Sequence, residues 1–418
     1  MVKKNIAART SCIAGVTLAL VLVLAAQRTN ALEDLEAEES ISDFLPSVYP
    51  APVQVAQSRS WAILPELGYA PDTGALAGAK FAHRDLLQSG ATLDFEATYA
   101  MNQQRSVSLS LGSPHLLEDR LLILLRGRYY FDPQREFFGL GNNDLSQDPD
   151  LPSTHEFQEL AGGVVVGWRP FDQLAFNLAV GLRRVDIGRS KRKDGLPLTQ
   201  EKFADLTGIN GGLANRLAVS LVWNNRDDVM RPTRGWRLIL KVAHTNKAAL
   251  SDFEFTRYVV DAGYLHSFFA KRLIAGIRVN GAYIDGPNNE VPFWELEELG
   301  GQDSMRGFFP HRFLGKERVL LNGELRFLLA QFDFFDLWHV KLDGVVFGDG
   351  GRVFLNHSDV RDEFRIDRSI FERVLGDFQY SYGGGLRIAL SNALVARIDV
   401  GFSDEETGLL YLSFGQTF

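Results

Sequence analysis

The chain has 418 residues, of which 45% are hydrophobic and 23% charged, and ordinary soluble proteins share these values. Its formal net charge of −8 argues against a nucleic-acid partner, because nucleic-acid-binding proteins carry a basic face. Cys12 is its one cysteine, so a disulfide within the chain is excluded.

The N-terminus has the pattern of a secretory signal peptide. Lys3, Lys4 and Arg9 precede an uncharged run over residues 11–26, and small residues follow. The alternative is a membrane-spanning helix, but about 16 residues is short for a span, which needs roughly 20. We predict a signal peptide over residues 1–26, with cleavage as late as residue 31.

The composition of residues 32–60 predicts a linker. An acidic run, which includes Glu36 and Glu39, is followed by Pro46, Pro50 and Pro52. Such a segment buries little apolar surface, so we expect it to be disordered.

The remaining chain, residues 61–418, alternates apolar and polar residues with a period of two. Trp236, Leu238 and Leu240, for example, alternate with Arg237 and Lys241. This is the signature of a half-buried strand. A soluble sandwich would turn the charged face to bulk water, whereas a membrane barrel turns it to the lumen.

About sixteen such strands are predicted, each near the ~10 residues that a tilted membrane strand needs. They begin near Trp61, Leu76, Ala91, Gln104, Leu121, Glu156, Leu174, Gly212, Thr233, Phe253, Arg272, Glu317, Trp338, Asp377, Ala393 and Gly408. The sequence therefore predicts an all-β fold, a transmembrane antiparallel β-barrel.

The long connections all follow odd-numbered strands and so lie on one side of the barrel. They are Pro133–His155, Arg189–Gly211, Pro287–Lys316 and Gly351–Gly376. Long loops on one side and tight turns on the other are typical of outer-membrane barrels. We expect the outer membrane as location, with the long loops extracellular and the C-terminus periplasmic.

The last predicted strand ends in an aromatic residue. Leu410, Leu412, Phe414 and Phe418 share one parity. This resembles the assembly signal of outer-membrane barrels, which implies the barrel-assembly machinery as a partner during biogenesis. The alternative is an edge strand that ends in Phe by chance.

Four local patterns resemble one family. They are GGQDSMRGFF over residues 300–309, FGDGG over 347–351, NRDDVMRPTRGWRL over 225–238, and the C-terminal run over 383–418. Together they resemble the BamA/TamA superfamily of barrel-assembly and two-partner-secretion proteins, also called the bacterial surface antigen family. Met305 stands where the family usually has Val.

The resemblance implies that the first pattern is a loop folded into the lumen. Its motif residues are Gly300, Gly301, Ser304, Arg306, Gly307 and Phe308, and its strand counterpart includes Phe347 and Gly351. Asp349 and Glu324 are at strand positions whose side chains should face the lumen. We expect Arg306 to dock on Asp349, with Glu324 as a second acceptor, because arginine and carboxylate form a strong bidentate pair.

The resemblance also implies a role in outer-membrane biogenesis, by insertion or translocation of a polypeptide or lipid client, in contact with outer-membrane lipid. Residues 32–60 are too short for the periplasmic POTRA domains of many relatives, so we expect the barrel-only branch. A passive diffusion pore is the first alternative.

A phospholipase-like enzyme is the second alternative, with His266 and Ser267 as the nearest candidate pair. Adjacent strand residues face opposite ways, and neither HExxH nor GxSxG occurs. We therefore expect no catalytic residue, no metal and no cofactor.

Overall fold

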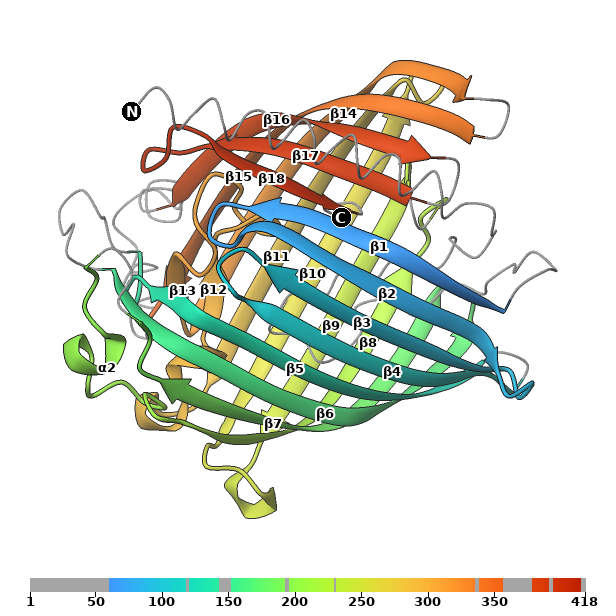
Figure 1. The fold of residues 1–418 in the computed structure, drawn as a ribbon. Coiled ribbons are helices and arrows are strands. Elements are labelled where there is room, and N and C mark those ends of the chain that lie inside the picture. Colours follow the sequence, from blue (N-terminus) through green and yellow to red (C-terminus); the bar gives the residue numbers. More distant parts are fainter. Residues whose placement is uncertain are drawn as a thin grey trace, which may run out of the picture.

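Sixteen long antiparallel strands form a closed barrel (Figure 1). They are β1 (Trp61–Ala70), β2 (Gly74–Leu86), β3 (Ala91–Ala100), β4 (Arg105–Leu116), β5 (Leu121–Phe137), β6 (Ser153–Phe171), β7 (Leu174–Gly188), β8 (Gly211–Asn224), β9 (Gly235–Thr245), β10 (Phe255–Phe268), β11 (Leu273–Asp285), β14 (Glu317–Phe334), β15 (Trp338–Phe354), β16 (Gln379–Leu390), β17 (Leu394–Phe402) and β18 (Leu409–Phe414). Each pairs with its neighbours in sequence order, and β18 closes on β1. The predicted fold class is confirmed.

The computed structural model describes residues 60–117, 120–142, 152–191, 195–228, 231–334, 338–355, 378–390 and 394–414. The predicted signal peptide lies outside these ranges, as do the linker up to residue 59, most of the predicted loop at 351–376, and Phe418. Within the described ranges, no helix is both long and apolar enough to cross a membrane.

Two predicted loops are shorter than expected, because the strands beside them continue. β5 runs on to Phe137 and β6 begins at Ser153, so residues 133–137 and 153–155 of the predicted loop belong to strands. A register irregularity between Asp132 and Arg135 accommodates Pro133, which cannot donate a ladder hydrogen bond. Similarly, β15 continues to Phe354, past the predicted loop start at Gly351.

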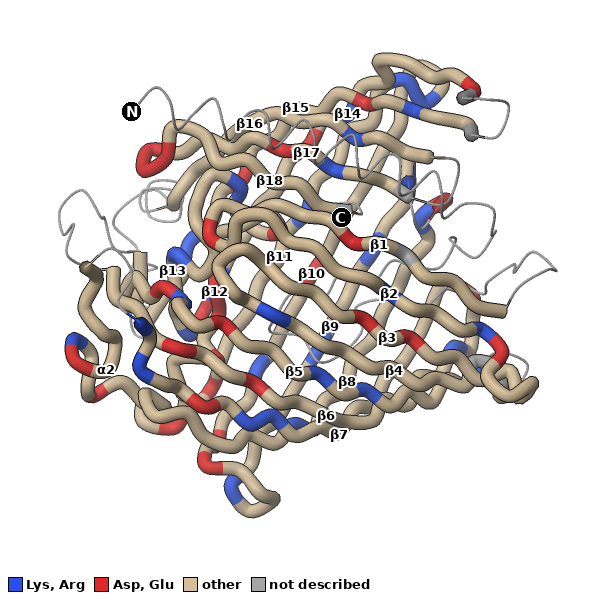
Figure 2. The backbone as a smooth tube through the Cα atoms, viewed as in Figure 1, with Lys and Arg blue, Asp and Glu red and all other residues tan. Residues whose placement is uncertain are grey.

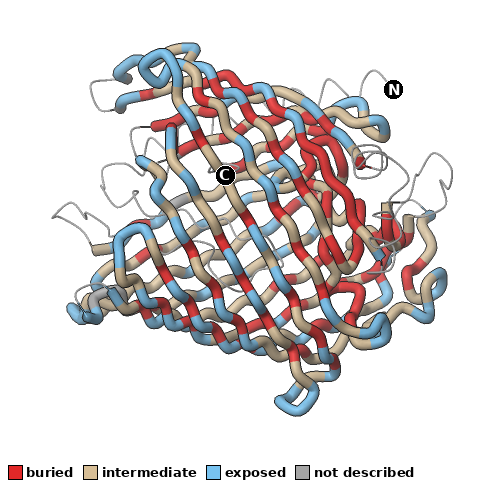
Figure 3. Tube along the Cα trace, turned by 180° about the vertical axis from the view of Figure 1, so that it is seen from behind, coloured by how far each residue is buried: buried red, intermediate tan, exposed pale blue. Residues whose placement is uncertain are grey.

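The barrel wall has an apolar outer face. On β7, Leu178, Val180 and Leu182 are about half exposed and alternate with the buried Asn177 and Ala179. Buried and exposed positions alternate along many of the strands (Figure 3). Exposed aromatic residues lie near both ends of the strands, as in the girdles of membrane barrels; they include Trp168, Trp223, Trp236, Tyr258, Tyr380 and Tyr382. Acidic and basic residues are interspersed along the strands (Figure 2).

The connection from β11 to β14, residues 286–316, folds into the barrel and has structure of its own. It contains the 3₁₀ turns η2 (Asn288–Glu290) and η3 (Phe293–Glu295) and the short strands β12 (Glu297–Leu299) and β13 (Phe313–Gly315), which pair with each other. Most of its residues from 291 to 315 are buried. We call residues 286–316 the inner segment. Elsewhere a helical turn α2 (Thr199–Lys202) and a 3₁₀ turn η1 (Lys247–Ala249) lie in connections on the same side.

The strand pairing is uneven around the barrel. β1 and β2 share ten register pairs and β17 and β18 share six, but β18 and β1 share only the pair Tyr69–Leu412 among the described residues. Among the described residues, which end at Phe414, this junction therefore has fewer register pairs than the others. We call the β1–β18 junction the seam.

Candidate functional site

The tip of the inner segment is a tight turn over residues 300–309. The Ser304 hydroxyl donates to the Gly300 carbonyl at 2.7 Å and accepts from the Gly300 amide at 2.9 Å, and the Gly301 amide donates to the Phe308 carbonyl at 2.9 Å. Gly307 has φ 107°, and a Cβ there would lie 2.9 Å from the Phe402 carbonyl group. Only glycine fits this position, because the turn presses its backbone against β17.

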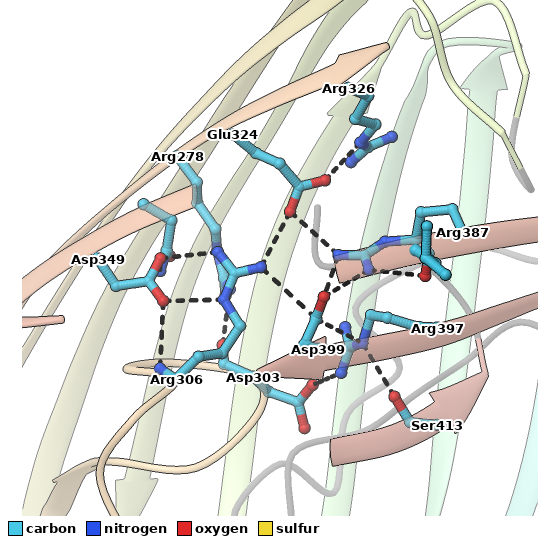
Figure 4. A network of polar contacts seen from close by, with 12 residues as sticks. Arg278, Asp303, Arg306, Glu324, Arg326, Asp349, Arg387, Arg397, Asp399 and Ser413 are labelled. Atoms are coloured by element: carbon cyan, nitrogen blue, oxygen red, sulfur yellow. Dashed lines mark hydrogen bonds and ion pairs between the residues drawn. The ribbon is translucent and has the colours of Figure 1, made fainter. Parts of the chain in front are cut away.

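The turn presents Arg306, whose side chain is completely buried (Figure 4). Its Nε and Nη2 atoms donate to the two oxygens of Asp349, each at 2.8 Å, and its backbone amide donates to the same carboxylate at 3.1 Å. Its Nη1 atom donates to Glu324 at 3.0 Å. Both predicted contacts of Arg306 are present, and the pair with Asp349 has the bidentate geometry of a strong charge-assisted bond.

The strand motif on β15 is the other half of this contact. Phe347, Asp349 and Gly351 are spaced by two residues, so all three face the lumen. The guanidinium of Arg306 lies 3.5 Å from the centre of the Phe347 ring. A Cβ on Gly351 would lie 2.8 Å from Leu299 and 2.9 Å from Met305. The three positions thus supply a ring face, a carboxylate and space for the turn.

Further charges surround Arg306, and their contacts were not predicted from the sequence. Asp399 on β17 lies 3.7 Å from its Nη1 atom, and Arg387 on β16 bonds both Asp399 at 2.6 Å and Glu324 at 3.3 Å. Arg397 reaches Asp303 of the turn at 3.0 Å, and Arg326 reaches Glu324 at 2.5 Å. Alternation along β17 could have placed the side chains of Arg397 and Asp399 in the lumen, but it does not identify their partners.

This group, which we call the arginine clamp, is balanced in charge: four arginines (306, 326, 387 and 397) meet four carboxylates (Asp303, Glu324, Asp349 and Asp399). Burial alone would lower the pKa of Arg306, but Asp349 and Glu324 outweigh it and raise that pKa above its already high ordinary value. Arg306 is therefore a permanent cation, and the clamp cannot be released by deprotonating it.

The turn is also fastened to the last hairpin. The Tyr411 hydroxyl on β18 donates to the Phe308 carbonyl at 3.0 Å and accepts from the Gly307 amide at 3.3 Å. The Ser403 hydroxyl donates to the Gly307 carbonyl at 2.7 Å. Phe308 itself is buried and packs edge-on against Phe313. The inner segment thus holds the strand that forms one side of the seam.

A second buried charge, Glu295 in η3, fastens the inner segment to another part of the wall. Its carboxylate accepts from Arg183 on β7 at 2.7 Å, Arg216 on β8 at 2.8 Å and Arg257 on β10 at 3.0 Å. Burial would raise the pKa of Glu295, but the three arginines outweigh it and hold this pKa far below its usual range. We call this group the glutamate clamp. It was not predicted from the sequence, since Glu295 belongs to none of the four patterns.

The predicted enzyme alternative gains no geometric support. His266 is exposed on the outer face, where its ring lies 4.6 Å from that of Phe268, and Ser267 has the opposite parity. The described residues also contain no group of three or more His, Cys, Asp or Glu that could hold a metal ion.

The predicted assembly signal is only partly described. Leu410 and Leu412 are half-buried and alternate with the buried Leu409, Tyr411 and Ser413. Phe414 ends β18, and Phe418 lies outside the described residues. A role of these residues in assembly stays a prediction.

Comparisons with known proteins agree with this architecture. The family model described as the Omp85 superfamily domain matches residues 86–418, and no curated protein matches the sequence. The fold is similar to BamA from Haemophilus ducreyi lacking POTRA domains 1–3, with a TM-score of 0.60 and 15% identity over 86% of this chain and 71% of that one.

It is also similar to CdiB from Escherichia coli (TM-score 0.55, 12% identity) and CdiB from Acinetobacter baumannii (TM-score 0.53, 12% identity). Each match covers 86% of this chain, but only 63% and 60% of the two CdiB chains. The match of the family model over most of the chain decides the assignment. The chain belongs to the Omp85 superfamily, and its barrel is of the outer-membrane type.

Proposed function

We propose that this barrel acts in outer-membrane biogenesis, by inserting or translocating a polypeptide or lipid client at the seam. The observation that carries the proposal is that the described residues of β1 and β18 share one register pair, Tyr69–Leu412. Unpaired backbone groups at a strand edge are a template for another strand, and they are costly in lipid unless they find partners. A weakly paired seam is therefore a place where a client strand or a lipid can enter the wall.

The closed lumen also favours this function over a passive pore. The inner segment occupies the lumen and is held there by the arginine clamp and the glutamate clamp. A diffusion pore needs a continuous aqueous path, which a buried, ion-paired segment obstructs. Membership of the Omp85 superfamily is consistent with a biogenesis role, and BamA and CdiB are similar in fold.

A disulfide across the seam tests the proposal. Tyr69→Cys with Leu412→Cys places two thiols on directly opposed residues, and Tyr69→Cys with Ala75→Cys makes a matched lock on the well-paired β1–β2 side. The assay is the folding rate of a urea-denatured outer-membrane barrel protein added to liposomes that contain this protein. The seam lock should abolish the acceleration, a reductant should restore it, and the control lock should have no effect. Equal acceleration by both locked forms would exclude the seam as the client's route.

Two further measurements address the alternatives. A large and stable single-channel conductance of the unmodified barrel would favour the pore. Phospholipid hydrolysis that disappears in Ser267→Ala would favour the enzyme.

We further propose that the long connections are extracellular and that the C-terminus is periplasmic. Lys247, in a connection on the long-loop side, and Lys271, in a turn on the other side, are both well exposed. An impermeant thiol reagent added to intact cells should label Lys247→Cys and spare Lys271→Cys. The reverse result would invert the orientation.

A further inference from the structure

The connection between β8 and β9, of which residues 225–228 and 231–234 are described, contains a sequence pattern that the arginine clamp does not use. The Asp227 carboxylate accepts from the Thr233 amide at 2.8 Å and the Thr233 hydroxyl at 2.6 Å, and the Asp228 carboxylate accepts from the Arg231 amide at 2.7 Å. Pro232 and Thr233 are buried. The described residues on the two sides of the connection are therefore braced against each other and turn inward at Pro232 and Thr233. They lie at the mouth opposite the inner segment.

The bracing presents Arg231 to the far side of that mouth. Its Nε atom donates to Asp343 on β15 at 3.0 Å, and its Nη2 atom lies 2.9 Å and 2.8 Å from the two oxygens of that carboxylate. Both side chains are largely buried, with exposures of 15% and 4%. Strands β10, β11 and β14 separate β9 from β15 in the barrel. Four spacings between neighbouring strands add up to about 19 Å along the barrel wall. The contact between Arg231 and Asp343 therefore joins two distant parts of the wall at this mouth.

Asp343 belongs to the same lumen-facing row of β15 as Asp349, because six residues separate them. One strand thus receives a bidentate arginine from each mouth: Arg306 from the inner segment and Arg231 from the β8–β9 connection. In addition, Lys271 of the β10–β11 turn donates to Asp227 at 3.1 Å, which ties the connection to the neighbouring turn.

We propose that residues 231–234 of the β8–β9 connection form a second closure of the lumen, latched by Arg231 on Asp343, at the mouth opposite the inner segment. The two closures act in series, so release of either one leaves the lumen blocked by the other. This arrangement lets the inner segment move without making the membrane leaky to ions and small solutes. It does not depend on which client the barrel serves.

Single-channel conductance of the full-length barrel in planar bilayers tests the proposal, with Arg306→Ala, Arg231→Ala and the double variant compared. Because the closures are in series, each single variant should raise the conductance by no more than about twofold and the double variant by about tenfold. Arg234→Ala is the matched control, since Arg234 is in the same connection but its side chain is 71% exposed. It should change nothing, alone or combined with Arg306→Ala.

A charge swap isolates the latch from any general damage. Arg231→Asp and Asp343→Arg, each combined with Arg306→Ala, should conduct like the double variant, and the two swapped together should return the conductance toward that of Arg306→Ala alone. Heat-modifiable migration on gels confirms that each barrel is folded. The proposal is wrong if Arg306→Ala alone conducts as well as the double variant, or if the swap restores nothing while every barrel is folded.

Discussion

The two clamps on the inner segment have opposite polarity. In the arginine clamp, one buried cation of the segment, Arg306, enters a set of carboxylates on β14, β15 and β17. In the glutamate clamp, one buried anion, Glu295, enters a set of arginines on β7, β8 and β10. A segment turned the other way would bury like charges together. The difference teaches that charge, as well as shape, fixes how the segment lies in the lumen.

The clamps also differ in what surrounds them. The glutamate clamp is on continuous wall, where β6 and β7 share fourteen register pairs. The arginine clamp is beside the last hairpin, and Tyr411 connects its turn to the weakly paired strand β18. Both ends of the segment are therefore held by well-paired strands, β7–β8 and β14–β15, but only the arginine clamp is also linked, through Tyr411, to a strand of the seam.

The largest effect is expected from breaking the arginine clamp. Arg306→Asp or Asp349→Arg leaves buried like charges, and loss of one partner of a buried pair costs about 3–5 kcal/mol. Hydrogen exchange at residues 300–309 should rise strongly, and the double swap should restore part of the protection. Barrel melting should barely change, because the strand hydrogen bonds dominate it.

The control for that experiment is an exposed arginine–aspartate pair, Arg184–Asp186, with side chains 65% and 52% exposed. Such pairs contribute about 0–1 kcal/mol, so Arg184→Asp should leave the exchange at residues 300–309 unchanged. Unchanged exchange in Asp349→Arg would mean that Asp349 does not hold the turn.

A smaller effect is expected from Glu295→Gln. Arg183 keeps Glu159 at 2.6 Å and Arg257 keeps Glu297 at 2.8 Å, so the loss should lie at or below the lower end of the ~3–5 kcal/mol range. Exchange should rise over residues 291–299 while residues 300–309 stay protected. If both stretches loosen together, the two clamps are one cooperative unit and the comparison between them fails.

The sequence predicted the barrel and the contacts of Arg306 with Asp349 and Glu324 for a clear physical reason. Alternation along a strand such as β9 is local, so it can be read without knowing the partners. The pair Arg306–Asp349 was predicted because both residues belong to patterns that resemble one family. Alternation along its strand also placed the side chain of Glu324 in the lumen, which made it the second predicted acceptor for Arg306.

The contacts that escaped prediction join elements far apart in the chain. Glu295 meets arginines on three strands, and Arg231 meets Asp343 across three intervening strands. Many arginines face the lumen, and strand parity does not say which of them lie opposite a given carboxylate. The pairing of β18 with β1 likewise joins the two ends of the barrel, so alternation along either strand does not predict it.

Tyr411→Phe should weaken the attachment between the turn and the seam strand by about 1–3 kcal/mol, because the Gly307 amide and the Phe308 carbonyl lose a buried partner. Disulfide formation between cysteines at positions 69 and 412 should then slow, since β18 is held less firmly. Tyr382→Phe is the control, because Tyr382 is 68% exposed on the outer face. An unchanged rate in Tyr411→Phe would separate the arginine clamp from the seam.

The smallest expected effect is a pH dependence confined to one end of the segment. Glu298 on β12 contacts His311, and its side chain is 22% exposed. Burial would raise its pKa, but His311 and Arg135 outweigh this and lower it from 4.5 to about 2. An acid with a depressed pKa stabilises the folded state fully above pH 4.5, and this contribution is lost as the pH falls toward about 2.

Docking of residues 297–299 should therefore weaken by about 1 kcal/mol in this window, as for a partly exposed ion pair. Glu295 should remain ionised there, because its pKa is held lower still. Hydrogen exchange of the two stretches 291–295 and 297–299, measured from pH 5 to 2.5 and corrected for intrinsic rates, compares them directly. Glu298→Gln should remove the dependence at 297–299; if the dependence persists, another group titrates, and the glutamate clamp is the first one to examine.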